Sequence, residues 1–259
     1  MPLGTTTINN ESSSNSFESF FESWLVRQEH YLDELLHHSN SSSDSDLIDL
    51  VSRVLSHYQQ YFDHKSIAAR NNVFLVFSPP WFTPFERTFL WIAGFKPGLA
   101  FRIVANSAGE LTADQRRRME ELARETKAAE REVAEELARV QESVAAPPIL
   151  EVARRQGRKD GEVREAEVVE GLRREMEAVL GKADLLRRKT AEKVVEILSP
   201  VQGVRFLAAA TQLQLRIRML GLQKEAEMRR TTSDGMAFEF FILHHHLSVT
   251  IMAMAARRH

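Results

Sequence analysis

Apolar residues recur every three or four positions over most of this chain, which is the spacing of helices that bury one face. The first such segment follows Ser16, a residue suited to cap a helix, and carries Phe17, Phe20, Phe21, Trp24, Leu25, Leu32, Leu35 and Leu36. A second segment starts near Asp46 and carries Leu47, Leu50, Val51, Val54, Leu55, Tyr58 and Phe62. Residues 65–80 have no clear period. We predict a helix end or an extended linker there, although residues 73–77 alone would suit a short strand.

Residues 81–97 contain two Trp, four Phe and two Pro. Thr83 is suited to cap a helix, with Pro84 at its first position and Glu86 at its third. Gly94 is suited to end that helix, and Pro97 to open a short one that reaches Asn106. So much rigid apolar surface predicts burial in a core, a ligand pocket or a partner's groove. Most buried aromatic residues simply pack in a hydrophobic core.

Two long charged helices are predicted further on. Thr112 and Gln115 form a capping box for the first, with apolar positions at Met119, Leu122, Thr126, Ala129, Val133, Leu137, Val140 and Val144. Prolines at 147 and 148 end it. The second carries Leu172, Met176, Val179, Ala183, Leu186, Thr190, Val194 and Ile197. A helix from Pro200 to about Leu220 is apolar nearly all round, which indicates burial, and Gly221 is expected to close it.

The pattern therefore predicts an all-α fold, a helical bundle with two long charged amphipathic helices and a buried C-terminal helix. The spacing also allows a coiled-coil pair, but steps of four after Ala129 and Leu186 break a strict heptad and favour packing within the chain. We divide the chain into a polar, disordered segment 1–15, a helical domain 16–222 and a flexible or atypical tail 223–259. Residues 231–235 of that tail resemble a linker.

Composition excludes several classes of protein. The chain has 259 residues, a formal net charge of −2 and no Cys, so disulfides, thiolate catalysis and Cys-ligated zinc are absent. The small net charge gives no global attraction to nucleic acid or anionic membrane. The Ser-rich start does not resemble a secretory signal. The most apolar window, residues 238–256, is interrupted by three His, so we predict a protein without a membrane span, in the nucleus or the cytoplasm.

The aromatic segment carries a resemblance to a known family. Trp81, Pro84, Glu86, Arg87, Trp91, Gly94, Phe95 and Pro97, followed by Phe101 and Arg102, resemble the signature of the plant seed-dormancy (DELAY OF GERMINATION) domain. The same domain forms the C-terminal part of TGA-type basic leucine-zipper transcription factors. Residues 17–24 resemble the opening helix of the family, and residues 200–210 its closing helix. The resemblance spans residues 17 to 222.

The resemblance implies a non-enzymatic regulator of seed maturation, dormancy or abscisic acid response that acts through protein partners. Type 2C protein phosphatases and transcription factors are the implied partners, and the protein could also pair with itself. Phe20, Phe21 and Trp24 on the first helix are the predicted partner surface, because aromatic residues are the usual anchors of interfaces. Packing of Trp24 into the core is an equally good interpretation of its position.

A second reading is a TGA-like regulator of transcription, recruited to DNA through a zipper-bearing partner. The segment before the domain is too short for a basic helix and zipper, so autonomous DNA binding is not expected. The basic runs at residues 116–118, 173–174 and 187–189 suit a solvated helix face, because Glu residues lie close to them. No P-loop, dinucleotide-binding glycine motif, nucleophile elbow or His-Glu-x-x-His motif is present, and no catalytic residue is predicted.

A third reading is a sensor of haem or of a fatty-acid-like ligand, which the resemblance implies. Haem needs an axial ligand, usually His, in an apolar cavity. The candidates are His30, His37, His38, His57, His64 and the cluster His244, His245 and His246, which could also bind a transition metal. The motif does not single out any of them, so the cofactor-binding residues stay unassigned and no metal site is predicted.

Overall fold

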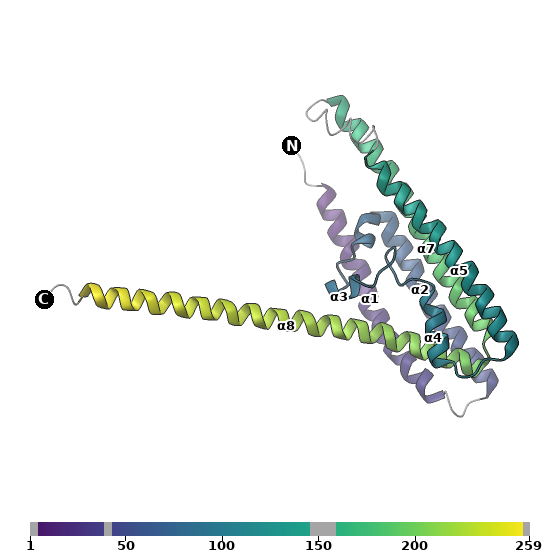
Figure 1. Ribbon diagram of the computed structural model, residues 1–259. Coiled ribbons are helices and arrows are strands. Elements are labelled where there is room, and N and C mark those ends of the chain that lie inside the picture. Colours follow the sequence, from purple (N-terminus) through teal and green to yellow (C-terminus); the bar gives the residue numbers. More distant parts are fainter. Residues whose placement is uncertain (1–4, 39–42, 146–158, 256–259) are drawn as a thin grey trace.

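The computed structural model describes the backbone of residues 5–38, 43–145 and 159–255, and the side chains of residues 16–38, 43–145 and 166–231. Within these residues the secondary structure is entirely helical: α1 (Thr5–His38), α2 (Asp44–Phe77), α3 (Pro84–Arg87), α4 (Leu99–Ser107), α5 (Ala113–Ser143), α7 (Lys159–Ile197) and α8 (Pro200–Ala255). Figure 1 shows α1 and α2 side by side, with α5 and α7 as a long pair beside them. The predicted all-α fold is confirmed.

The core is a set of apolar clusters shared between helices. The largest joins α1 and α2 to α4, α5, the end of α7 and the first turns of α8, and includes Leu35, Val54, Val104, Val194 and Leu207. Val204, Phe206 and Leu207 on α8 are almost inaccessible, as the apolar character of that segment predicts. The packing of α8 against α1, α2 and α4 makes its N-terminal part the buried helix of the bundle.

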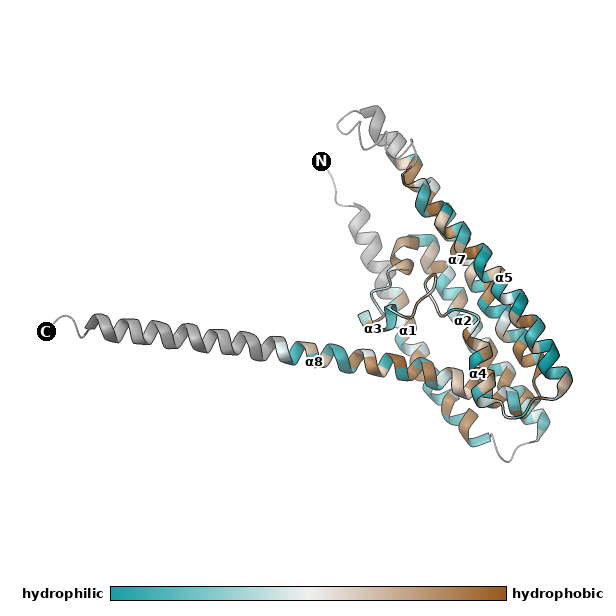
Figure 2. Ribbon diagram, viewed as in Figure 1, coloured by the Kyte–Doolittle hydropathy of each residue, from teal (hydrophilic) through white to brown (hydrophobic). Residues whose placement is uncertain are grey.

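Helices α5 and α7 form an antiparallel pair. The Lys182 ammonium lies 2.6 Å from the Glu136 carboxylate, and that of Lys193 lies 3.5 Å from the Glu125 carboxylate. Residue numbers therefore increase along α7 in the direction in which they decrease along α5. Thr126 and Thr190 meet inside the pair. Figure 2 shows hydrophilic residues interleaved with hydrophobic ones along both helices. The predicted capping box at Thr112 is present, because its hydroxyl accepts from the Gln115 amide and the Gln115 side chain accepts from the Thr112 amide.

Helix α2 is longer than the sequence pattern indicated. It continues through residues 65–77, where we expected a helix end or linker, with one non-helical residue at Asn72. The Asn72 side chain accepts from the Leu75 amide and so caps the short helical continuation after the kink. Val73 and Val76 are fully buried there. Tertiary burial has therefore overridden the weak local period.

Helix α8 does not end at Gly221. It runs on to Ala255, through the stretch that resembles a linker. Gly221 instead lies against α3, where an added Cβ would overlap the Thr83 hydroxyl. This glycine therefore permits a close helix contact and does not terminate the helix. Helix α1 likewise begins at Thr5, before Ser16. The division of the chain at residues 15 and 222 stays a prediction.

Candidate functional site: a cavity beside a cation-held loop

The segment between α3 and α4 is a loop, although the sequence pattern predicted a helix up to Gly94. The capping box is present as predicted, with the Thr83 hydroxyl accepting from the Glu86 amide at 3.2 Å and the Glu86 carboxylate accepting from the Thr83 amide at 2.7 Å. Helix α3 nevertheless ends at Arg87. Residues 88–97 then form turns, one of them closed by the Trp91 amide donating to the Gly94 carbonyl at 2.7 Å.

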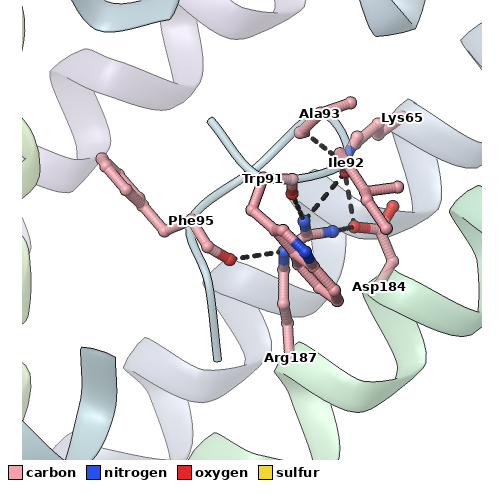
Figure 3. A network of polar contacts seen from close by, with 7 residues as sticks. All are labelled: Lys65, Trp91, Ile92, Ala93, Phe95, Asp184 and Arg187. Carbon is pink, nitrogen blue, oxygen red and sulfur yellow. Dashed lines mark hydrogen bonds and ion pairs between the residues drawn. The ribbon is translucent and has the colours of Figure 1, made fainter. Parts of the chain in front are cut away.

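Two cations from neighbouring helices hold the carbonyls of this loop (Figure 3). The Arg187 guanidinium on α7 donates to the carbonyls of Trp91, Ile92 and Phe95, the last two at 2.8 Å. The Lys65 ammonium on α2 donates to the Ala93 carbonyl at 2.7 Å. Asp184 binds both cations through the same oxygen, and its distance to Lys65 is 2.9 Å. The loop carbonyls thus accept hydrogen bonds from side chains, whereas carbonyls in a helix accept them from backbone amides.

The loop backbone is strained where these cations hold it. Ile92 and Ala93 have φ values of 47° and 55°, in the left-handed region that β-branched residues rarely adopt. Such residues cost on the order of 1–3 kcal/mol each and persist only where their surroundings fix them. Ile92 is buried against Val133, Val179 and Ala183 of the long helix pair. A Cβ on Gly94 would meet the Arg187 guanidinium, so close approach requires glycine there.

Burial changes the acid–base behaviour of this cluster. Lys65 is 2% exposed, and desolvation lowers its pKa to about 8, while Asp184 opposes that shift. Burial also lowers the pKa of Arg187 and, as the dominant cause, raises that of Tyr61. Both cations bind the Asp184 carboxylate directly, and the buried Glu130 also attracts Arg187.

The loop forms one wall of an apolar cavity of about 230 Å³. Its other walls come from α2, α4, α7 and α8, with Trp24 of α1 and Phe82 also contributing. Most of the lining is aliphatic or aromatic, and the buried Lys65 and Arg187 also contribute to it. An apolar pocket with a few convergent polar groups is the usual form of a small-molecule site.

The predicted partner residues have different environments. Phe21 and Trp24 are buried in an aromatic cluster with Phe17 and Trp81. Trp24 stacks on His57 with ring centroids 4.6 Å apart and donates to the His57 carbonyl. Phe20 is half-buried and stacks on the exposed His64, centroids 3.7 Å apart. In this conformation only Phe20 of the three offers a partner an accessible ring, and its role as an anchor stays a prediction.

The residues of the aromatic motif also differ in burial. Trp81, Glu86 and Pro97 are buried, Trp91, Gly94 and Phe95 are partly buried, and Pro84 and Arg87 are exposed. Arg218 of α8 donates to the Trp81 carbonyl and the Glu86 carboxylate, at 3.2 and 3.3 Å, and lies over the Phe21 ring. The motif therefore fastens the loop segment to α8 at one end and to α7 at the other.

The described histidines do not provide an axial haem ligand in this cavity. His30, His37, His38 and His64 are exposed. His57 is buried, and neither ring nitrogen has a hydrogen-bond partner among the described residues, but it does not line the cavity. His244, His245 and His246 lie in the part of α8 whose side chains are not described. Across the side chains that are described, no cluster of acidic and imidazole groups could hold a metal ion.

The cation cluster is absent from the sequence-based predictions. The sequence pattern places Arg187 with Arg188 and Lys189 on a solvated face, yet the Arg187 side chain is only 8% exposed. The signal lies in the spacing, because Arg187 falls four residues after Ala183 and three before Thr190, both buried. Lys65 likewise follows Tyr61 by four and precedes Ala69 by four on the buried face of α2. A charge on a buried stripe is expected to be paired.

Comparison with known proteins assigns the family. The sequence model of a family described as "DOG1: Seed dormancy control" matches residues 30–106. Protein ZW2 of Arabidopsis thaliana is 39% identical over 221 residues, which cover 82% of this chain and 98% of that protein. The chain belongs to the seed-dormancy (DOG1) family. Protein RESPONSE TO ABA AND SALT 1 of the same plant is 40% identical and matches 81% of this chain and 96% of its own length. The resemblance drawn from the aromatic motif is confirmed.

TGA-type transcription factors are more distant relatives. Transcription factor TGAL1 of Oryza sativa subsp. japonica is 28% identical over 84% of this chain, which spans 48% of that protein. The relatives found are dormancy-type and transcription-factor proteins and not enzymes. In the described part of this chain, no helix is long and apolar enough to cross a membrane.

Proposed function

We propose that this protein is a non-enzymatic regulator of seed dormancy and abscisic acid response that acts in the nucleus or cytoplasm by binding protein partners. The observation that carries the proposal is the match over nearly the full length of two dormancy-family proteins, one of them described as RESPONSE TO ABA AND SALT 1. The helical body supports it, because several of its helices present exposed apolar side chains to solvent.

The implied partners are type 2C protein phosphatases and transcription factors. The accessible stack of Phe20 on His64 lies between α1 and α2 and is the part of the predicted partner surface that another protein can reach. An aromatic ring buried at an interface typically supplies a large share of the binding energy. Phe20 is therefore the residue on which we place partner recognition.

Affinity capture from extracts of maturing seeds tests this function. The wild-type chain should enrich a type 2C phosphatase or a transcription factor, as identified by quantitative mass spectrometry. Phe20→Ala should reduce that enrichment, whereas Leu185→Ala, which truncates an exposed residue on α7, should not. Capture of neither class by the wild-type protein would contradict the proposal.

A second candidate is regulation of transcription through a zipper-bearing partner, and the TGA relatives favour it. Direct contact with DNA has less support. Arg187 is buried in the loop cluster, and Arg173 binds Glu170 and Glu177 on its own helix. Gel shifts with and without a TGA factor discriminate. This candidate predicts a shift only when the factor is present, and a salt-sensitive shift by the purified chain alone would contradict that mode of recruitment.

A further inference from the structure

The cavity beside the loop carries an excess of positive charge. Lys65 and Arg187 are both buried, and Asp184 is the carboxylate that faces them directly. The other charged residues of the cavity wall are balanced, since Arg188 is paired with Glu192 at 3.7 Å and Lys96 with Glu130 at 3.4 Å. Glu130 also attracts Arg187 from a greater distance. Among the directly bonded groups Lys65, Arg187 and Asp184, there is therefore one more cation than anion beside the apolar space.

A buried charge without a counter-charge is unfavourable, and a bound anion would offset it. An ammonium has three N–H donors. Among the described residues, Lys65 uses two of them, toward the Ala93 carbonyl and Asp184. The third donor remains for a ligand.

The size and lining of the cavity restrict that ligand. The volume of about 230 Å³ lies below the 300–1,000 Å³ typical of sites for drug-sized molecules. The walls are aromatic and aliphatic, with Tyr61, Phe82, Phe95, Ile103, Leu207 and Ala210 among them. A compact apolar body with one anionic end matches this space, whereas a long acyl chain would extend outside it.

We propose that the cavity binds a compact apolar monocarboxylate, of the size of a two-ring aromatic acid, with its carboxylate on the Lys65 ammonium. The rings lie against the aromatic and aliphatic walls. Since Lys65 also holds the Ala93 carbonyl, the bound acid is linked to the conformation of the 88–97 loop. This inference does not depend on which protein partner the chain recognises.

Isothermal titration calorimetry with the full chain at pH 7 tests the proposal, with 1-naphthaleneacetate as the probe and its uncharged amide as the matched ligand. The wild-type protein should prefer the acid by on the order of tenfold or more, which is the usual worth of a charge-assisted hydrogen bond. Equal affinities, or no binding of either ligand, would overturn the proposal. Tighter binding of palmitate than of 1-naphthaleneacetate would overturn the size limit.

Three variants localise the effect. Lys65→Met should abolish the preference for the acid and keep affinity for the amide, because the aliphatic stem remains. Ala210→Leu should weaken the binding of both ligands, because the larger side chain fills the cavity and leaves Lys65, Asp184 and Arg187 unchanged. Lys193→Met, which removes an exposed lysine elsewhere on α7, should behave as wild type. Circular dichroism checks that each variant is folded. A folded Lys65→Met that still prefers the acid, or a folded Ala210→Leu that binds as wild type, would contradict the assignment.

Discussion

At the scale of single residues, two glycines inside helices have opposite roles. Gly221 lies where an added Cβ would overlap Thr83, whereas Gly181 has nothing within 4 Å of that position. Gly221→Ala should therefore destabilise the fold by roughly 1–3 kcal/mol through overpacking. Gly181→Ala should stabilise it by roughly 0.5–1 kcal/mol through helix propensity. Urea unfolding of the two variants measures both. Equal effects of the same sign would contradict the close contact between α8 and α3.

Lys65 makes the free energy of unfolding depend on pH in the alkaline range. Its pKa falls from 10.5 in the unfolded chain to about 8 in the folded protein, because burial disfavours the charged form. Between pH 8 and 10.5 the unfolded chain binds more protons, so the Lys65 contribution to stability rises with pH. The free energy of unfolding should gain up to roughly 3 kcal/mol relative to Lys65→Met over this window. Parallel pH dependences for the two proteins would show that Lys65 titrates normally.

His57 makes the free energy of unfolding depend on pH in the acid range. Burial lowers its pKa from 6.5 to about 4, with the nearby Arg27 as a smaller cause. The stability that depends on neutral His57 is fully present above pH 6.5 and is lost as the pH falls toward 4. His57→Phe keeps the ring stacked on Trp24 and should remove this part of the acid sensitivity. Denaturant unfolding at pH 7, 5.5 and 4.5 compares the two.

At the scale of elements, the 88–97 loop is defined by what binds its carbonyls. Arg187→Gln removes most of the donors to Trp91, Ile92 and Phe95 and leaves the strained residues less constrained. Hydrogen exchange of the Trp91 amide, which donates to the Gly94 carbonyl, should then accelerate by on the order of tenfold or more. Arg188→Gln, on the partly exposed side of the same helix, is the control and should leave this amide protected. Unchanged exchange in Arg187→Gln would mean that packing alone holds the loop.

Regular periodicity and capping chemistry made the helices predictable from sequence. The capping boxes at Thr83 and Thr112, the long pair α5 and α7 and the buried start of α8 follow from local pattern. The path of residues 88–97 does not, because its carbonyls are satisfied by Lys65 and Arg187, which are distant in sequence. The role of Gly221 does not follow from local pattern either, because its close neighbour Thr83 is distant in sequence. The cavity and its charge excess follow only once these long-range contacts are known.

At the scale of the whole molecule, the aromatic motif connects the two halves of the chain. The motif packs against α1 and α2 and is bound to α8 by Arg218, which donates to the Trp81 carbonyl. It is bound to the α5–α7 pair by Arg187 and by the burial of Ile92. The described part of the chain is thus a helical body with a small apolar cavity inside and accessible helix faces outside. We propose that this body acts in dormancy and abscisic acid response by binding protein partners through these faces.

Direct binding of a purified partner tests this account most simply. The full chain is immobilised and titrated with a type 2C protein phosphatase of abscisic acid signalling and, separately, with a TGA-type factor, and binding is followed by interferometry. The account predicts saturable binding of at least one of them with a Kd on the order of 1 µM or tighter. Absence of binding to both at roughly a hundred times that concentration would contradict it.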